Sequence, residues 1–524
     1  MEKRVLIAAV LSFAVLYAYS LMFPAPPAKQ PQTQTAPSAV AQVQQSAQAL
    51  TPVVMPKSSS ERLIEIETDL YRAVFSTHGA ALKEFVLKKY REDASAQSKN
   101  VVMVSEADPA NYPLQTSISG MFQDSQTIYD VSTSRLTVAK GAANTIVFST
   151  RLPSGVTYRK TYTFAPDSYL ISLESSIENT SSTPVSGSLA LSYLNRIPQE
   201  SAKVKHDDFS APVNSAGKVD FVTLKNLQKA PKSFDKDIAW SVFSDKYFLN
   251  ALISDHNSIA SARVSRDVAV VNRSVASAPL SVAPGASASL KHKIYIGPKD
   301  IDSLKSSNVG LEEAIDLGWF SMLAKPLLHS LKFFYGYTSN YGLAIIIITI
   351  ILKIVFYPLT HSSYRSMKEM QKLQPKMTAI REKFKSDKDA MNKAIMELYR
   401  DHKVNPLGGC LPMLVQIPVF FALYKALMFS IELRHAPFYF WITDLSAQDP
   451  YYITPILMGA SMVIQQKMTP STMDPMQAKI MMFLPIVFTF MFLNFPSGLV
   501  IYWLVNNILT ILQQWRINHL LKEA

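Results

Sequence analysis

Five apolar stretches crowd the last third of the chain, and they restrict the possible folds more than any other feature. A helix of roughly 17 to 25 apolar residues can cross the hydrocarbon layer of a bilayer. The stretches cover residues 341–357, 411–430, about 452–466, 480–495 and about 498–515. Together with an apolar run near the N-terminus, they predict a multi-pass α-helical membrane protein with six transmembrane helices, five of which form a core at 341–524.

The N-terminal run begins with the basic sequence Met1–Arg4 and continues without charge from Val5 to Phe23. A cleaved signal peptide has the same order of features, but its apolar part is usually only about 7 to 15 residues long. We therefore predict a retained anchor at 1–23 with its N-terminus in the cytoplasm. Residues 24–60 are rich in Pro, Ala, Gln, Ser and Thr, which indicates a flexible linker.

Residues 61–298 alternate apolar and polar side chains, as half-buried β-strands do. The clearest segments are Leu63–Glu67, Val156–Phe164, Tyr169–Glu174 and Leu290–Ile296. Turn sequences that contain Pro and Gly separate the segments. Many short strands in succession predict a large antiparallel β-sandwich, which the anchor would deliver to the far side of the membrane.

Residue patterns for covalent chemistry are absent from the sequence. His78, His206 and His256 lack metal-ligand spacing, and each is more simply a satisfied or solvent-facing side chain. Cys410 is the only cysteine, and neither a phosphate-binding Gly-Lys loop nor a His-Glu-x-x-His motif occurs. Most of the net charge of +12 lies beside the apolar spans, where basic residues more often set orientation than bind nucleic acid. We expect no catalytic residue, no cofactor, no metal and no nucleotide hydrolysis, and a β-domain that serves binding or structure.

The region 299–340 contains an apolar stripe that recurs every four residues. Its members are Leu311, Ile315, Trp319, Leu323, Leu327 and Leu331. Acidic residues lie off this stripe, and Trp319 and Lys325 suit a lipid headgroup zone. We predict one amphipathic helix in the membrane interface, and a helix that caps the sandwich is the alternative.

Charges in the loops orient the predicted spans. Residues 361–410 carry eleven Lys and Arg against six Asp and Glu, whereas residues 431–451 carry one Arg and three acidic residues. Because basic loops tend to stay in the cytoplasm, the first loop is placed inside and the second outside. Both termini are therefore predicted to be cytoplasmic.

The cytoplasmic segment 361–410 has a helical periodicity of its own. Apolar residues recur at spacings of three and four on both sides of the charged turn Lys385–Asp389, which predicts an antiparallel helical hairpin. The stripe is rich in methionine, with Met367, Met370, Met377 and Met391. Flexible Met side chains suit contact with varied apolar surfaces, but the stripe can equally be the seam that joins the two helices.

One cation, Lys353, lies inside the first apolar stretch of the core. Holding a charge at this depth costs about 2.5–3.5 kcal/mol, so such a residue usually faces the bundle interior or a wet cavity. No Asp or Glu occurs in the later apolar stretches as a counter-ion. The polar residues that can share a groove with Lys353 are Thr349, Gln416, Tyr502, Asn506 and Gln513. The alternatives are that Lys353 snorkels to the headgroups and that the other residues make helix–helix hydrogen bonds.

Several motifs resemble those of the YidC/Oxa/Alb membrane insertase family. They are Tyr357–Thr360, Leu373–Lys376, Asn405–Cys410, Leu445–Tyr452 and Phe495–Val500. One anchor, a large outer β-domain and a five-span core resemble the members from Gram-negative bacteria. The motif resemblance covers about 341–515, and the N-terminal part matches by architecture. It implies an inner-membrane protein with a periplasmic domain that inserts nascent membrane proteins and helps them fold, alone or beside the Sec translocon.

The resemblance also implies a hydrophilic groove that opens to the cytoplasm and to lipid and carries a cation on the first core helix. Lys353 occupies that position, where many members carry Arg, so an electrostatic role is kept but bidentate pairing is lost. Thr349 matches a groove residue, Tyr502 matches directly, and Trp503 falls where some relatives have a substrate-contacting tyrosine. The β-domain resembles a β-supersandwich of the sugar-mutarotase type. The implied partners are nascent membrane proteins, the Sec translocon with its accessory subunits, membrane lipid, and a ribosome or targeting factor.

Two other functions compete with an insertase. A secondary transporter would use Lys353 to bind an anionic solute, but the sequence shows neither coupling carboxylates in the spans nor an internal repeat. An envelope enzyme would carry its active site in the β-domain, where the sequence offers no cleft of titrating groups.

Overall fold

The computed structural model describes residues 60–95, 97–140, 144–196, 209–255, 257–267, 271–385, 387–402, 404, 411–469 and 475–523. The predicted anchor at 1–23 and, apart from Ser60, the predicted linker at 24–60 lie outside the described residues. The same holds for His206, His256 and Cys410.

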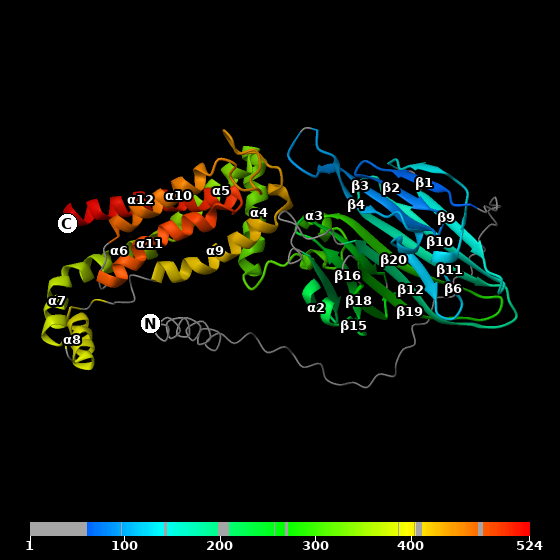
Figure 1. The fold of residues 1–524 in the computed structure, drawn as a ribbon, viewed down its shortest axis with the longest axis horizontal. Coiled ribbons are helices and arrows are strands. Elements are labelled where there is room, and N and C mark those ends of the chain that lie inside the picture. Colours follow the sequence, from blue (N-terminus) through cyan, green and yellow to red (C-terminus); the bar gives the residue numbers. More distant parts are fainter. Residues whose placement is uncertain are drawn as a thin grey trace. The chain divides into compact units, whose positions relative to one another are not determined.

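The described part of the β-region forms three sheets (Figure 1). The nine-stranded sheet has the order β14 (Lys218–Thr223), β13 (Ser210–Ser215), β16 (Ile238–Ser244), β17 (Phe248–Ser254), β20 (Ser287–Pro298), β11 (Leu170–Asn179), β10 (Val156–Phe164), β9 (Thr145–Arg151) and β7 (Asp130–Val131). The six-stranded sheet has the order β15 (Lys232–Phe234), β18 (Ser261–Asp267), β19 (Val271–Val282), β12 (Val185–Arg196), β5 (Gln115–Ile118) and β6 (Phe122–Gln123). The five-stranded sheet has the order β4 (Asn100–Ser105), β3 (Ala81–Arg91), β2 (Tyr71–Ser76), β1 (Leu63–Glu67) and β8 (Arg135–Thr137).

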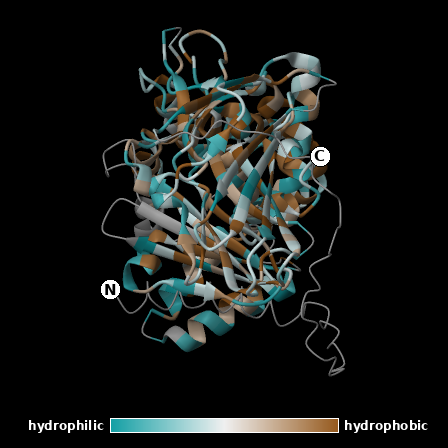
Figure 2. Cartoon of the chain, turned by 90° about the vertical axis from the view of Figure 1, so that its right-hand side faces the viewer, coloured by the Kyte–Doolittle hydropathy of each residue, from teal (hydrophilic) through white to brown (hydrophobic). Residues whose placement is uncertain are grey.

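The strands lie where the alternating pattern predicts them. β1 and β10 have the predicted bounds, while β11 begins one residue later and β20 extends further at both ends. Buried and less buried residues alternate along β10, so one face of the strand packs and the other is closer to solvent. Figure 2 shows the corresponding mixture of hydrophilic and hydrophobic residues along the strands. The predicted antiparallel domain is confirmed, with one exception: β1 and β8 run parallel over three residue pairs.

Polar contacts join the nine-stranded sheet to the two others. The ammonium of Lys160 on β10 donates hydrogen bonds to the backbone oxygens of Gly79, 2.9 Å away, and Leu114, 2.8 Å away. Asn250 on β17 donates from Nδ2 to Oδ1 of Asn195 on β12 at 2.7 Å. Because buried polar groups need partners, these bonds favour one arrangement of the sheets over others that bury the same apolar area.

His292 on β20 makes the stability of the β-domain depend on pH. Its side chain is buried, and burial lowers the pKa to about 4, while nearby Asp255 acts in the opposite direction. An unfolded histidine has a pKa of about 6.5, so between about pH 6.5 and 4 the unfolded chain binds a proton that the folded chain excludes. The free energy of unfolding should therefore fall on acidification through this window, by up to about 3 kcal/mol. Urea unfolding at pH 7 and pH 4.5 measures it, and His292→Gln should remove this part of the dependence; an unchanged dependence in His292→Gln would contradict the assignment.

The helical part begins differently from the prediction. Short helices α2 (Leu224–Lys229) and α3 (Ile301–Lys305) belong to the β-region and its exit, and η4 (Leu311–Ala314) is a single 3₁₀ turn. The predicted continuous helix from Leu311 to Leu331 is wrong, because the chain turns at Asp316–Gly318 and α4 covers only Ser321–Thr338. Gly318 adopts a positive φ of 68°, and its N–H donates to the Asp316 carboxylate at 2.9 Å. This turn ends the stripe: Leu311 and Ile315 are buried, whereas Trp319 is 95% exposed.

The core helices follow the apolar stretches of the sequence. They are α5 (Tyr341–Val355), α9 (Leu411–Phe429), α10 (Ile453–Met468), α11 (Pro475–Phe492) and α12 (Ser497–Glu523), with the 3₁₀ turn η5 (Ile431–Leu433) after α9. The helix α6 (Tyr357–Lys372) instead lies mostly in the charged segment 361–410. Among the described helices, none is by itself long and apolar enough to cross a membrane, but the pair α5 and α6, bent by 59°, meets that requirement jointly. The six-span arrangement stays a prediction.

The hairpin in the segment 361–410 is present, but its first arm is broken. The chain leaves α6 at Leu373, and α7 (Gln374–Lys383) starts with Pro375 in its first turn. Asp387 caps α8 (Lys388–Asp401) by accepting hydrogen bonds from the backbone N–H groups of Asp389 and Ala390. Pro375 cannot supply a helical N–H, so it ends the preceding helix and starts the next one.

Candidate functional site

A small cavity surrounds Lys353 where α5, α6, α9 and α12 meet. Its volume is about 30 Å³. It is lined by Thr349, Leu352, Lys353, Phe356, Leu359, Thr360, Gln416, Val419, Tyr502 and Asn506. The structure thus brings together five of the predicted groove residues from three separate helices. A space of this size holds only one or two water molecules, so a peptide segment can enter only if the helices separate.

Lys353 is held by a neutral partner. Its ammonium donates a hydrogen bond to Oγ1 of Thr510 on α12 at 2.6 Å, and the Thr510 hydroxyl donates in turn to the backbone oxygen of Asn506 at 2.6 Å. Among the described residues, no carboxylate pairs with Lys353. No ion pair therefore neutralises the ammonium, and two of its three donors are left for another acceptor.

The other polar residues of the cavity are bound to helices. Gln416 on α9 donates from Nε2 to Oδ1 of Asn506 at 3.0 Å, which ties α9 to α12. The Thr349 hydroxyl donates to the backbone oxygen of Ile345 at 2.7 Å, so its hydrogen is used within α5. Tyr502 is 3% exposed and lies beside Gln416. These residues therefore combine hydrogen bonds between helices with a polar lining around a cation.

Trp503 lies apart from the cavity lining. Its ring meets Phe420 edge to face, with centroids 4.7 Å apart, and also contacts Phe488 and Phe492 on α11. Consecutive residues on a helix point about 100° apart, which explains why Tyr502 faces the cavity and Trp503 faces this aromatic cluster. Gln513 is likewise not part of the lining.

Sequence reasoning missed Thr510. The residue is 7% exposed and lies one helical turn after Asn506, so it continues the polar face of α12. This spacing was the available signal. A threonine in an apolar helix commonly donates a hydrogen bond to a backbone carbonyl of the same helix. The sequence therefore gives no reason to expect a second contact with Lys353.

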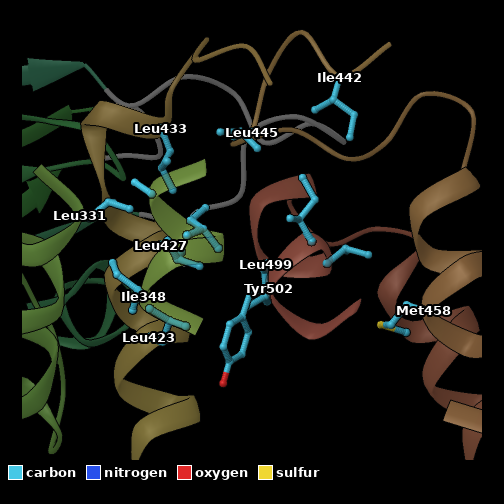
Figure 3. Packing of buried hydrophobic residues seen from close by; sticks show 14 of the residues in the cluster. Leu331, Ile348, Leu423, Leu427, Leu433, Ile442, Leu445, Met458, Leu499 and Tyr502 are labelled. Atoms are coloured by element: carbon cyan, nitrogen blue, oxygen red, sulfur yellow. The ribbon is translucent and has the colours of Figure 1, made fainter. Parts of the chain in front are cut away.

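An apolar cluster packs the loop between α9 and α10 against α12. Leu445 of that loop is fully buried above Leu499 of α12, and Figure 3 shows the hydroxyl of Tyr502 pointing away from both. The loop is bound to the start of α12, because the backbone oxygen of Ala447 accepts hydrogen bonds from N and Oγ of Ser497 at 2.7 and 2.8 Å. Phe438 packs so closely on Gly342 that a Cβ there would lie 2.0 Å from the ring.

Asp449 holds the loop between α9 and α10 against the start of α10. Its fully buried carboxylate accepts hydrogen bonds from Trp441 Nε1, from the N–H of Tyr451, and from both N and Oγ1 of Thr454, all between 2.7 and 3.0 Å. Asp449→Asn keeps the shape but turns an NH₂ group toward two of these donors. We expect a local destabilisation of about 1–3 kcal/mol, measured as faster hydrogen exchange at the first amides of α10. Exchange equal to wild type would show that the four bonds do not hold the loop.

The methionines of the hairpin divide into two groups. Met370 and Met377 are buried, and the Tyr399 hydroxyl lies 3.3 Å from the Met377 sulfur across the seam of α7 and α8. Met367 and Met391 are only partly buried. Met377 fits the seam interpretation, and contact with other proteins stays a prediction for the partly buried pair.

Two family models together match nearly all of the chain that the structure describes. Residues 63–330 match the model described as the YidC periplasmic domain, and residues 333–524 match the model described as the 60Kd inner membrane protein.

Curated relatives are similar over their full length. A protein of Citrifermentans bemidjiense named membrane protein insertase YidC is 52% identical over 535 residues, covering 99% of both chains. The protein with the same name from Geotalea daltonii is 53% identical over 527 residues, again covering 99% of both chains.

Proposed function

The chain belongs to the YidC family of membrane protein insertases, and we propose that it inserts nascent membrane proteins into the inner membrane by way of the cavity beside Lys353. The observation that carries the choice of site is an ammonium on the apolar helix α5 that no described carboxylate neutralises. A partly buried cation in an apolar helix is costly to keep, so its presence there indicates a use.

The physical basis of insertion is electrostatic and hydrophobic. The Lys353 charge would attract acidic residues of an entering tail, and the surrounding low dielectric would strengthen that attraction. Polar lining from Gln416, Tyr502 and Asn506 would shorten the distance over which the tail is desolvated. The apolar part of the substrate would then leave toward lipid, because burial of apolar surface in hydrocarbon is favourable. No covalent step, metal or nucleotide is needed for any of these events.

The proposal includes the arrangement in the membrane and the partners. The chain would cross the inner membrane six times with both termini in the cytoplasm and the β-domain in the periplasm. The hairpin of α7 and α8 would receive substrates from a ribosome or targeting factor, and the Sec translocon would cooperate for some substrates. Lys353, Thr349, Gln416, Tyr502 and Asn506 would line the groove. Trp503 would contact substrate only after the aromatic cluster rearranges.

Reconstitution tests this function. Purified protein in liposomes should protect the translocated tail of a single-span substrate from external protease more than protein-free liposomes do. If the tail is protected equally in liposomes with and without the protein, the insertase function is contradicted. An anion-transport function has no support among the relatives, and uptake of a labelled anion by the same vesicles would be required to revive it.

A further inference from the structure

The hydroxyl of Thr510 lies between the Lys353 ammonium and the backbone of α12. Its single hydrogen is donated to the Asn506 carbonyl, so toward Lys353 the oxygen can only accept. A hydroxyl that donates to a helix carbonyl is also a stronger acceptor, because hydrogen bonds in a chain polarise one another. The arrangement directs one lone pair at the ammonium from a buried, fixed position.

We propose that Thr510 is a positioning residue that holds the Lys353 ammonium inside the groove and thereby sets the preference for substrates with acidic tails. The proposal rests on the proposed insertase function and adds to it the residue that positions the cation. A lysine stem is flexible and can carry its charge to the headgroups, and Tyr357 marks the end of the apolar segment only one turn away. The bond to Thr510 opposes that movement.

A neutral partner suits this task better than a carboxylate would. Asp or Glu at position 510 would hold Lys353 equally well but would neutralise its charge, leaving little attraction for a substrate. The Thr510 hydroxyl occupies one of three ammonium donors and leaves two for an entering carboxylate. Lys353 is thus held in place without an ion pair that would neutralise it.

This role predicts an effect that depends on substrate charge. Without the hydroxyl, the ammonium spends less time in the groove, so attraction for an acidic tail falls. A neutral tail gains little from that charge in the first place. Thr510→Val replaces the hydroxyl by a methyl group of nearly the same volume, so it removes the hydrogen bonds and keeps the shape.

The experiment compares two matched substrates in liposomes that contain the full-length protein. One is a single-span protein with Asp and Glu in its translocated tail, and the other has Asn and Gln at those positions. Thr510→Val should lower the initial rate of insertion of the acidic substrate about fivefold to tenfold and change that of the neutral substrate less than about twofold. Thr510→Ser keeps the hydroxyl and should stay near wild type. If the Thr510→Val protein cannot be purified, Thr510→Ala also removes the hydroxyl and should show the same dependence on substrate charge.

A double-mutant cycle distinguishes an effect of Thr510 on the position of Lys353 from an effect on helix packing. If Thr510 acts through Lys353, adding Thr510→Val to Lys353→Ala should cause no further loss with the acidic substrate. Equal losses for both substrates, additive losses in the cycle, or no loss at all would each overturn the proposal. Failure of the wild-type protein to insert either substrate would instead overturn the proposed function, and this proposal with it.

Discussion

Replacing Lys353 by Glu should lower the insertion of a substrate with an acidic tail by about tenfold or more. The change turns attraction for a carboxylate into repulsion, and two charges a few ångströms apart in a medium of effective dielectric constant near 20 interact by a few kcal/mol. The cavity offers no described carboxylate or second cation that could compensate. Protease protection of the substrate tail in liposomes measures the effect.

The control for this prediction is the sign of the substrate charge. Lys353→Arg should retain most activity, because the groove keeps its positive charge although the donor geometry changes. With a tail of Lys and Arg in place of the acidic residues, the order of wild type and Lys353→Glu should reverse. If Lys353→Glu inserts all substrates as well as wild type does, Lys353 snorkels and has no part in insertion.

The sequence predicts the position of the core helices well, and the reason is local. Long apolar runs interrupted by charged or Pro-containing segments leave few choices for where a helix begins and ends. The same local signals explain β1 and β10, whose strict alternation fits only a strand with one buried face.

The prediction of one helix from Leu311 to Leu331 is wrong because the apolar spacing begins before the helix does. Leu311 and Ile315 have the spacing of the stripe that continues into α4, but the turn at Asp316–Gly318 separates them. Their burial comes from packing before α4 begins, which spacing alone cannot distinguish from a helix face. Pro375 is the opposite case: the break after α6 has a local cause that the sequence displays.

The candidate site was predictable as a set of polar residues but not as a network. Helical spacing places Tyr502 and Asn506 on one face of α12, and the same spacing places Thr510 on that face. Which helix that face meets depends on the packing of α5, α9 and α12, and the sequence does not encode this packing in any short motif. For the same reason Trp503, next in sequence to Tyr502, was assigned to the groove although its ring lies among Phe420, Phe488 and Phe492.

The buried ion pair of the β-domain gives the largest expected effect on stability. Lys160 and Asp124 are both inaccessible to solvent and 2.5 Å apart. Asp124 also accepts hydrogen bonds from the Tyr129 hydroxyl and from N and Oγ1 of Thr116. Removing one member of such a pair leaves an uncompensated buried charge, which costs about 3–5 kcal/mol.

Asp124→Leu should therefore lower the free energy of unfolding of the β-domain by about 3–5 kcal/mol, because the Lys160 ammonium would keep only its backbone carbonyl partners. Hydrogen exchange of β10 in the full-length protein in detergent, followed through a urea series, measures this change. Asp220→Asn is the matched control, since its pair with Lys232 is nearly half exposed and should contribute less than about 1 kcal/mol. Adding Lys160→Met to Asp124→Leu should recover part of the loss, because the double variant buries no charge. If the double variant is instead less stable than Asp124→Leu, the carbonyl contacts of Lys160 rather than its charge hold the sheets together.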